Sequence, residues 1–393
     1  MLGRRAVTFV NALVLAGDGT THRTLRVRRG VVDGIGTPPQ PRDQIVDVDD
    51  AVVMPGLINA HDHLELNSFP RMKWRGCYAN VREWIADFQP RFGTDPALAL
   101  ARPDTLEDRV WVGGLKNLLS GVTTVCHHNP LHAPLTRRFP VRVAHRIGIG
   151  HSLQIDGARL AESHRATPAE WPWIVHAAEG VDAEARGEIA HLQALGCLGN
   201  NTVLVHGVAL DAGAAARVLA AGASLVWCPT SNEFLFNKTA TVTLFSEERR
   251  VALGTDSRLS GVGDLLDELR AASQTRQLSN EALVRTVTSN AASLLRLPDA
   301  GALVVGQPAD LVVLRRRASN PFDSIVAATR DDVRLTMVAG VPLLGVSEMR
   351  PVFAARWQPS VRVRVNGADR LLASWIARRV KRMTLREPGL EVC

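Results

Sequence analysis

The sequence predicts an α/β fold: a (β/α)8 TIM-like barrel that carries a small β-sandwich formed by both chain ends. From residue 52 onward, short β-branched runs alternate with helical stretches rich in Ala, Leu, Arg and Glu, which is typical of a parallel sheet covered by helices. Residues 52–300 span 249 positions, and barrels of this kind have about 250 residues. Short strands without intervening helices occupy residues 1–51 and return after residue 300, which predicts a separate β-unit.

The elements of the barrel follow one another in a regular order. We expect its strands at residues 52–60, 122–127, 141–149, 173–176, 202–206, 224–228 and 251–255. The helices between and after them are expected at 80–88, 105–119, 183–195, 212–221, 263–273 and 283–295. A doubly wound sheet shows the same alternation, and the length of the region favours the barrel.

The two chain ends supply the remaining strands. At the amino end we expect strands at residues 6–15, 24–28, 30–35 and 45–48, and after the barrel at 301–305, 311–314 and 335–344. The chain is therefore predicted to divide into an N-terminal part of the β-sandwich (1–51), the barrel (52–300), a C-terminal part of the β-sandwich (301–350) and a basic tail with an amphipathic helix (351–393).

The positive charge of the chain is concentrated in the tail. The net charge is +7, and residues 350–393 hold ten basic and three acidic side chains, so the remaining residues are neutral overall. A nucleic-acid-binding protein needs a basic face on its folded body, and this distribution argues against one. The apolar stretches are broken before they reach the roughly 20 residues that a membrane span needs, so no transmembrane segment is expected.

The cysteines and the amino terminus favour a cytoplasmic protein. Five cysteines without a CxxC pair fit a reducing compartment: Cys77, Cys126, Cys197, Cys228 and Cys393. Arg4 and Arg5 precede an apolar run and so imitate a secretion signal. The run contains Asn11 and lacks a clear small-residue cleavage site. We therefore interpret it as the first strand.

Histidines and an aspartate follow the predicted barrel strands. His61 and His63 are two residues apart at the end of one strand, so both imidazoles share one face. His176, His206 and Asp256 end three further strands, and a barrel directs all such ends to one mouth. Three imidazoles and a carboxylate suit Zn²⁺ or Fe²⁺ with positions left for water. Each residue alone is equally well read as a buried histidine or a helix-start acid.

Glu179 lies three residues after His176. It is within reach of the same mouth and is not needed as a ligand. This placement suits the delivery of a proton to a leaving nitrogen.

In its motifs, the chain resembles the amidohydrolase superfamily, and within it the metal-dependent deaminase/chlorohydrolase branch that includes the cytosine deaminase-like enzymes. The matching segments are PGLINAHDH (55–63), GVTTV (121–125), VHAAEG (175–180), LVHG (204–207), CPTSN (228–232), GTDS (254–257) and the stretch 290–314. The resemblance covers roughly residues 1–345.

The resemblance implies a role for each matching residue. His61, His63, His176 and Asp256 would bind one divalent metal ion, Zn²⁺ or Fe²⁺. His206 would hold the attacking water or the developing oxyanion, Glu179 would carry a proton to a ring nitrogen of the substrate, and Asp256 would also take the proton of the water. A single metal is favoured because the 141–149 strand ends in neither the Lys nor the Glu that bridges two metals in other members. Asn232 would order a loop.

The match is weakest where substrate contacts are expected. Only 54 residues separate Gly121 from His176, fewer than relatives use, which implies that one βα unit is shortened or lost. His127 and His128 follow a strand and are candidates for substrate contact or an extra metal site, although solvated-loop or core histidines are the alternative. Glu65, Arg71 and Trp84 are further candidate substrate contacts, with Trp84 and Phe88 also readable as the buried stripe of a helix.

The tail departs from the family. A helix over residues 369–385 would place Leu371, Leu372, Trp375, Ile376, Val380 and Met383 on one face and basic residues elsewhere. Such a helix can lie on an anionic membrane. Docking of its apolar stripe on the domain, or on a second subunit of a homo-oligomer, is the alternative that we favour.

The sequence therefore predicts a metal-dependent hydrolase for a small-molecule substrate. The reaction expected is hydrolytic deamination of an amino-substituted N-heterocycle by metal-activated water, because addition to an aromatic ring needs protonation of the ring nitrogen, which the His176/Glu179 pairing suits. Hydrolysis of a cyclic amide or amidine, dechlorination, and a catalytically lapsed protein of the same fold stay open.

Overall fold

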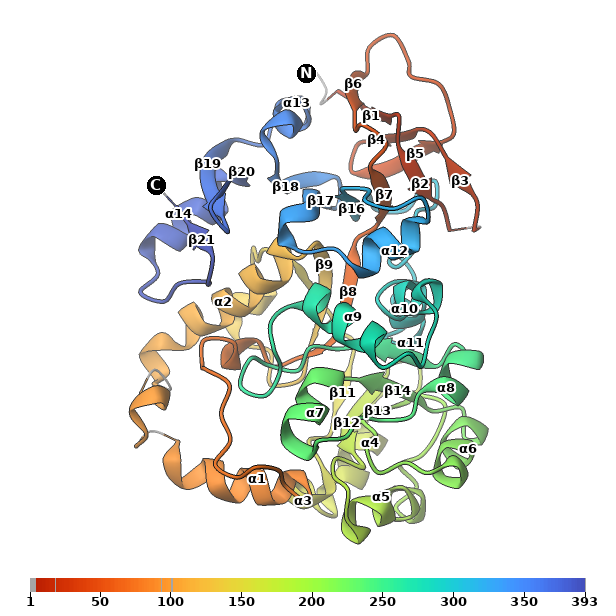
Figure 1. Ribbon diagram of the computed structural model, residues 1–393, viewed down its shortest axis with the longest axis vertical. Coiled ribbons are helices and arrows are strands. Elements are labelled where there is room, and N and C mark those ends of the chain that lie inside the picture. The colour runs from red at the N-terminus through yellow and green to blue at the C-terminus, as the bar shows by residue number, and fades with distance from the viewer. Residues whose placement is uncertain (1–4, 18, 93, 100–101, 393) are drawn as a thin grey trace.

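The computed structural model describes residues 5–17, 19–92, 94–99 and 102–392. Figure 1 shows an elongated molecule in which the first strands (red) and the last elements (blue) share one end, and the yellow and green segments form the other. The site lies among the parallel strands of that second part, so the chain ends support it from one side.

Eight parallel strands run in chain order through the central region. They are β8 (Leu57–Asp62), β9 (Val122–His127), β10 (Arg142–Val143), β11 (Gly148–Ile149), β12 (Trp173–Ala177), β13 (Thr202–His206), β14 (Ser224–Trp227) and β15 (Val251–Leu253). Strands β10, β9 and β8 form one sheet and β11 to β15 another, with every pairing parallel. The predicted α/β class with parallel strands is confirmed.

The two parallel sheets meet at one margin through backbone hydrogen bonds. The amides of Thr255 and Asp256 both donate to the carbonyl of His61, at 3.0 and 3.1 Å, so the end of β15 lies against β8. Gly254 permits this approach, because a Cβ there would lie 2.6 Å from the Cβ of His61. At the other margin, no strand pairing joins β10 to β11 among the described residues.

The region expected as one strand over residues 141–149 differs from the prediction. It contains two strands of two residues each, β10 and β11, joined by residues 144–147 without a helix. The alternation of strand and helix is therefore incomplete at this point. The polar and basic residues His145 and Arg146 interrupt the apolar run, which explains why one continuous strand does not form.

Helices cover the parallel sheets. They are α1 (Val81–Phe88), α2 (Leu106–Leu119), α3 (Leu153–Asp156), α4 (Arg159–Ala166), α5 (Ala183–Ala194), α6 (Ala212–Ala220), α7 (Pro229–Phe236), α8 (Thr243–Glu247), α9 (Leu265–Gln274), α10 (Asn280–Thr286) and α11 (Ser289–Leu294). Several begin at a residue whose side chain accepts a hydrogen bond from a backbone amide of the first turn, as Asp182, Asp211 and Asp264 do. The helix expected over residues 283–295 is divided into α10 and α11.

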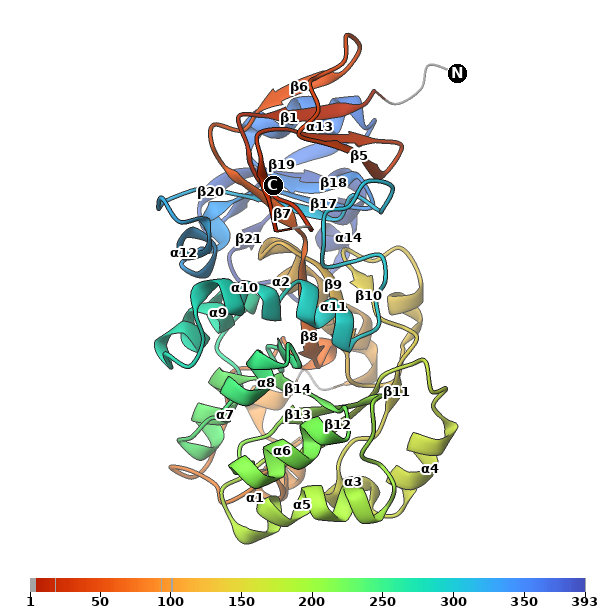
Figure 2. The ribbon, with the colours of Figure 1, turned by 90° about the vertical axis from the view of Figure 1, so that its right-hand side faces the viewer.

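The chain ends build two further sheets. The first has the order β5-β4-β1-β6 and the second the order β21-β19-β20-β18-β17-β16-β7-β2-β3. Their bounds are β1 (Val7–Val10), β2 (Leu13–Leu15), β3 (Thr21–His22), β4 (Leu25–Arg28), β5 (Val31–Ile35), β6 (Gln44–Asp47), β7 (Val52–Pro55), β16 (Leu311–Leu314), β17 (Val333–Val338), β18 (Val341–Gly345), β19 (Ser360–Val365), β20 (Ala368–Ala373) and β21 (Leu390–Glu391). Figure 2 shows the two sheets at the end of the molecule that carries the amino terminus.

One apolar core joins these two sheets. Val7, Phe9 and Val27 of the first sheet share it with Val53 and Val313 of the second. β7 therefore belongs to this region, although the sequence pattern predicts that it continues into the barrel strand. Gly56 separates β7 from β8, and a Cβ there would meet the side chain of Thr123 at 2.2 Å. The strand expected over residues 301–305 is absent from the structure, which has irregular backbone there.

The tail is part of the folded body. Residues 360–373 form β19 and β20, and β20 pairs with β18 through Leu372 and Leu344. The helix expected over residues 369–385 is thus shorter, because its first part is a strand: α14 spans Ser374–Arg382. Short helices α12 (Pro321–Val326) and α13 (Arg350–Ala355) complete this region.

The apolar face of α14 is covered by the protein itself. Ile376, Ala377 and Val380 are buried in the same core as Trp111 and Leu115 of α2. Within the described residues, no helix is long and apolar enough to cross a membrane.

Candidate active site and metal centre

The four side chains predicted as metal ligands meet at the carboxyl ends of the parallel strands. His61 and His63 end β8, His176 lies near the end of β12, and Asp256 follows β15. The structure brings together two sets of three potential ligands, each with its ligand atoms within 4.8 Å of one another: His61, His176 and His206, and His61, His63 and Asp256. All five side chains are buried.

The distances between ligand atoms suit a small cation. The Nε2 atoms of His61 and His176 are 3.3 Å apart, and Nε2 of His63 lies 3.7 Å from Oδ1 of Asp256. Two ligands of a tetrahedral zinc ion, each at about 2.1 Å from the metal, are separated by roughly the same distance. The strand ends therefore hold the donor atoms at the spacing of a coordination shell.

Hydrogen bonds assign the ring nitrogens of these histidines. Nδ1 of His176 lies 2.8 Å from the carbonyl of His151, and a carbonyl only accepts, so this nitrogen carries the proton. Its Nε2 is then unprotonated and carries a free lone pair. His128 donates from Nε2 to the carbonyl of Gly150 at 3.1 Å, so its Nδ1 accepts from Nδ1 of His61 at 3.2 Å. Nε2 of His61 is thus also unprotonated and carries a second free lone pair.

Two buried lone pairs that face each other at 3.3 Å cannot bond to each other. Each lies out of contact with water, and an unpaired buried acceptor is costly. A cation between them satisfies both, and the partners on the far nitrogens fix the tautomer that coordination needs. The residues present therefore fit one divalent metal ion.

Burial keeps the imidazoles neutral, as metal ligands must be. Desolvation holds the pKa of both His61 and His176 well below the usual value, and the neighbouring histidines add to the effect. Asp256 stays ionised. Burial alone raises its pKa, but the charges of His63 and His206 and the hydroxyls of Ser260 and Ser231 hold the pKa below its ordinary value.

Glu179 stands beside His206 at the same mouth. Its Oε1 lies 3.4 Å from Nε2 of His206, whose Nδ1 pairs with Oδ1 of Asn232 at 2.8 Å. Burial, together with the negative charges of Asp256 and Glu188, raises the pKa of Glu179 well above the ordinary value. Glu179 is therefore a buried carboxylic acid with a proton to give.

Backbone strain marks the same place. His206 and Asp256 both have positive φ, at 77° and 52°, a conformation that costs an L-residue with a side chain and that clusters at functional sites. Each strand thus turns sharply as it ends, and the turn directs its side chain into the mouth.

Sequence reasoning missed the hydroxyls that hold Asp256. The side chains of Ser231 and Ser260 each donate to its Oδ2 at 2.8 Å, and the amide of Ser257 donates to Oδ1 at 2.7 Å. Ser231 and Asn232 belong to the CPTSN segment, and Ser257 to GTDS. The motifs were therefore the available signal, whereas Ser260 stands outside them.

A buried ion pair that the sequence did not reveal supports the HxH strand. Lys116 of α2 is fully buried and lies 2.9 Å from Oδ2 of Asp62, the residue between the two histidines. Lys116 also donates to Asn67 and Thr255, at 2.7 and 3.0 Å. Because Thr255 precedes Asp256, this network connects both halves of the ligand set.

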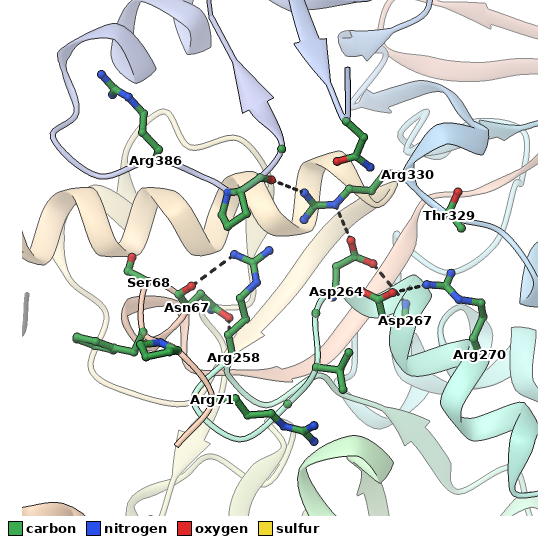
Figure 3. A pocket seen from close by; sticks show the side chains of 18 of the residues that line it. Asn67, Ser68, Arg71, Arg258, Asp264, Asp267, Arg270, Thr329, Arg330 and Arg386 are labelled. Atoms are coloured by element: carbon green, nitrogen blue, oxygen red, sulfur yellow. Dashed lines mark hydrogen bonds and ion pairs between the residues drawn. The ribbon is translucent and has the colours of Figure 1, made fainter. Parts of the chain in front are cut away.

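A cavity of about 220 Å³ opens above these groups. Trp84 lines it, together with apolar residues of α1 and the neutral side chains Gln89, Asn129 and Ser152. The other four candidate substrate contacts are placed elsewhere. Arg71 lines a separate cavity of about 890 Å³ (Figure 3), and His128 lies behind His61.

Glu65 and His127 lie beside the cavity wall, outside its lining. Oε1 of Glu65 accepts from Asn129, and Nδ1 of His127 accepts from the amide of Leu64 at 3.3 Å. Glu65, His127 and His132 have ligand atoms within 4.8 Å of one another. However, the bond from Leu64 leaves the proton of His127 on Nε2, the nitrogen that faces Glu65. His127 therefore offers a metal no free lone pair in this cluster.

The chain is similar to known amidohydrolases and deaminases. Residues 165–343 match the amidohydrolase family. The chain is 29% identical over 380 residues to a 5-methylthioadenosine/S-adenosylhomocysteine deaminase of Halobacterium salinarum, covering 82% of this chain and 88% of that protein. A second such deaminase, from Nitratidesulfovibrio vulgaris, is 24% identical over 362 residues, covering 75% and 80%.

A solved structure shows the same fold. An adenosine deaminase from Xanthomonas campestris with bound zinc has a TM-score of 0.69 at 19% identity, covering 90% of this chain and 98% of that chain. At this identity the likeness shows the fold, which is TIM-barrel-like. By its motifs, its family match and its relatives, the chain is similar to proteins of the amidohydrolase superfamily.

Proposed function

We propose that this protein is a metal-dependent aminohydrolase that removes the exocyclic amino group of an N-heterocycle by hydrolysis. The observation that carries the proposal is the convergence of His61, His63, His176 and Asp256 beside Glu179, a buried acid that retains its proton. The names of the relatives, which are deaminases of adenine-containing compounds, point in the same direction.

The four ligand residues would hold one divalent ion, Zn²⁺ or Fe²⁺, and zinc is bound in the similar adenosine deaminase structure. When bound, such an ion acts as a Lewis acid and lowers the pKa of water from 15.7 towards about 7. The remaining chemistry belongs to side chains of this chain.

Glu179 would protonate the ring nitrogen adjacent to the amino-bearing carbon. This proton makes the carbon electrophilic enough for water to add, because the protonated ring nitrogen can accept the electron pair of the C=N bond. The ionised carboxylate of Asp256 would take a proton from the attacking water and pass it to the departing amine. Nε2 of His206, whose other nitrogen is tied to Asn232, would hold the water in position.

The finer architecture also belongs to the proposal. We infer that the two parallel sheets act as one eight-stranded barrel, an inference supported by the hydrogen bonds from Thr255 and Asp256 to His61. We also infer that the two terminal sheets, which share a core, form a β-sandwich. Both inferences explain why strand ends far apart in the sequence collect at one mouth.

The test is metal analysis followed by a screen for ammonia release. Protein prepared with Zn²⁺ or Fe²⁺ is expected to bind one equivalent of metal and to release ammonia from at least one amino-substituted purine, pyrimidine, pterin or triazine. Substitution Glu179→Gln is expected to lower kcat by about 10²–10⁴-fold, the usual contribution of a general acid, without loss of the metal.

Other outcomes of the same screen would reject the proposal. Protein that binds no metal would indicate a lapsed member of the family. A ring-opened product or released chloride in place of ammonia would show that the chain acts on a cyclic amide or a chlorinated ring. Near-normal turnover of Glu179→Gln on the active substrate would remove the role given to Glu179.

A further inference from the structure

One wall of the site cavity is apolar, aromatic and fixed in position. Trp84 and Phe88 of α1 stack with ring centroids 5.1 Å apart and an angle of 13° between their planes. The indole N–H of Trp84 already donates to the carbonyl of Met72 at 3.1 Å. The ring therefore presents a flat apolar face to the cavity without a donor of its own. Such a wall suits the face of an aromatic heterocycle.

Apart from histidines, the ionisable side chains that line the cavity are acidic. Glu179 and Asp256 reach it from the catalytic side, and the other polar side chains are histidines, Gln89, Asn129 and three serines. Among the described residues, neither Lys nor Arg lines it. A carboxylate or phosphate on a ligand would therefore find no side-chain cation outside the metal centre.

The arginines of this part of the molecule face another cavity. Arg71 and Arg258 line the larger one in Figure 3, on the far side of the loop 257–261. Ser257, Leu259 and Ser260 of that loop face the site cavity instead. The loop is thus the partition between an arginine-rich hollow and the site.

Neither arginine is free to turn towards the site. Arg71 donates to the carbonyls of Ser260 and Thr230, both at 2.6 Å, and its guanidinium lies 4.1 Å from the ring centre of Phe234. Arg258 forms two bonds with the carboxylate of Glu387, at 2.8 and 2.7 Å. Reorientation of either would break these bonds and leave buried groups without partners.

The size of the cavity restricts the ligand further. Its volume of about 220 Å³ is below the roughly 300–1,000 Å³ of sites for drug-sized ligands. A charged appendage would have to be desolvated in this space without a counter-ion, and burial of an unpaired charge is strongly unfavourable.

We propose that the substrate is a compact amino-heterocycle whose substituents are absent or apolar, and that the site rejects the same heterocycle when it carries a carboxylate or phosphate. This inference rests on the proposed aminohydrolase function. The names of the relatives contain two compounds that the inference separates. We expect the site to accept 5′-methylthioadenosine, which ends in a methyl group, and to reject S-adenosylhomocysteine, which ends in an amino acid with a carboxylate.

The experiment compares kcat/KM within matched pairs on the metal-loaded protein. The pairs are 5′-methylthioadenosine with S-adenosylhomocysteine, and adenosine with adenosine 5′-monophosphate. If neither pair is turned over, the active heterocycle of the screen is compared with its carboxymethyl derivative. We expect kcat/KM to be about 100-fold higher for the uncharged member of each pair, which corresponds to about 2.7 kcal/mol. A preference below about tenfold would overturn the inference.

A charge introduced at the cavity wall gives an independent test. For each variant we compare the ratio of kcat/KM for the charged substrate to kcat/KM for the uncharged substrate. This ratio is expected to be about tenfold higher in Gln89→Arg than in Gln89→Met, the control that resembles arginine in size and lacks its charge. Equal ratios in the two variants would overturn the inference.

The outcomes separate this inference from the proposed function. Turnover of charged and uncharged members alike would leave the aminohydrolase function in place and remove the selectivity. Failure of metal-loaded protein to release ammonia from any amino-heterocycle would remove the function itself, and the selectivity with it.

Discussion

At the scale of single residues, His128 has a position that the sequence did not disclose. It follows β9, and its place in the sequence made it a candidate for substrate contact or an extra metal site, with a solvated-loop or core histidine as the alternative. In the structure it bridges the carbonyl of Gly150 and Nδ1 of His61. It therefore acts behind the metal centre, where it keeps the proton of His61 on Nδ1 and the lone pair on Nε2.

Two substitutions of His128 should show whether zinc affinity depends on its hydrogen bond to His61 or on the volume of its side chain. His128→Leu removes the acceptor for His61 and should weaken zinc binding by about 10–100-fold, the usual effect of losing such a partner. In His128→Asn the amide oxygen can take the place of Nδ1, so affinity should stay within about threefold of the parent. Chelator competition on the apo protein measures the affinity, and long-range ¹H–¹⁵N spectra report the tautomer of His61.

A histidine away from the site serves as the control for this pair. His164 packs its ring against Trp173, with centroids 4.9 Å apart, and His164→Leu should leave zinc affinity unchanged. If His128→Leu and His128→Asn bound zinc equally well, the role in positioning His61 would be wrong.

Glu268 should make stability depend on pH. It is buried on α9, where it accepts from the amide and hydroxyl of Thr230 at 2.9 and 2.6 Å, and burial raises its pKa from 4.5 to about 8. Between these values the unfolded chain releases a proton that the folded chain retains. The free energy of unfolding should therefore fall as pH rises, by up to about 1.4 kcal/mol per pH unit from this group.

Glu268→Gln should remove this contribution. Urea unfolding of parent and variant between about pH 5 and about pH 8 measures it: the difference in stability should shift in favour of the variant as the pH rises. A difference that is constant with pH would show that Glu268 does not retain a proton in the folded protein.

At the scale of the elements, sequence patterns predicted several of the parallel strands well. Strands β9, β12, β13 and β14 lie within about a residue of their predicted ranges, because each is a short apolar run that ends in polar residues. His61, His63, His176, His206 and Asp256 were identifiable for the same reason. Lys116 and Ser260 were not, since a buried lysine or serine has the same local sequence signature as an exposed one.

The failures at this scale have a different cause. The break of 52–60 into β7 and β8 depends on which neighbouring strand is available for pairing, whereas His145 and Arg146 interrupt the strand expected over 141–149. β7 pairs with β16 and β2, both from the terminal regions. The pairing of β7 with β16 spans more than 250 residues and leaves no trace in the local pattern of apolar side chains.

The loop after β15 is tied to the tail by a buried carboxylate. Glu387 is fully buried and pairs with Arg258 and Arg330, and Arg258 lies two residues from Asp256. Glu387→Gln would leave the largely buried guanidinium of Arg258 without its counter-charge and Arg330 with Asp264 alone. Removal of one partner from such a buried set costs about 3–5 kcal/mol, and urea unfolding should show a loss of this size.

A surface pair provides the comparison for Glu387. Glu107 lies 3.1 Å from Arg379 with 61% of its side chain exposed, so Glu107→Gln should cost less than about 1 kcal/mol. If the two substitutions had equal effects, the tail would not anchor the loop.

At the scale of the whole molecule, the division into four regions stays a prediction, and the role of the tail has become clearer. The sequence showed a basic, amphipathic segment but could not show what covers its apolar side. The structure places β20 beside β18 and α14 on α2. Helix α2 lies more than 250 positions before α14 in the chain, and local periodicity does not reveal so distant a partner.

This arrangement makes a prediction about membranes. The apolar residues of α14 are buried against α2, Arg379 pairs with Asp108 at 2.9 Å, and Trp375 is held between Trp111 and Arg138. Membrane insertion of the helix would require these contacts to break. The exposed basic residues Arg378, Lys381 and Arg382 can offer only a charge attraction that salt screens. Intact protein should therefore remain in the supernatant when sedimented with phosphatidylserine vesicles at physiological salt, with its tryptophan emission unchanged. Co-sedimentation with a blue shift of that emission would show that the helix leaves α2 for the lipid.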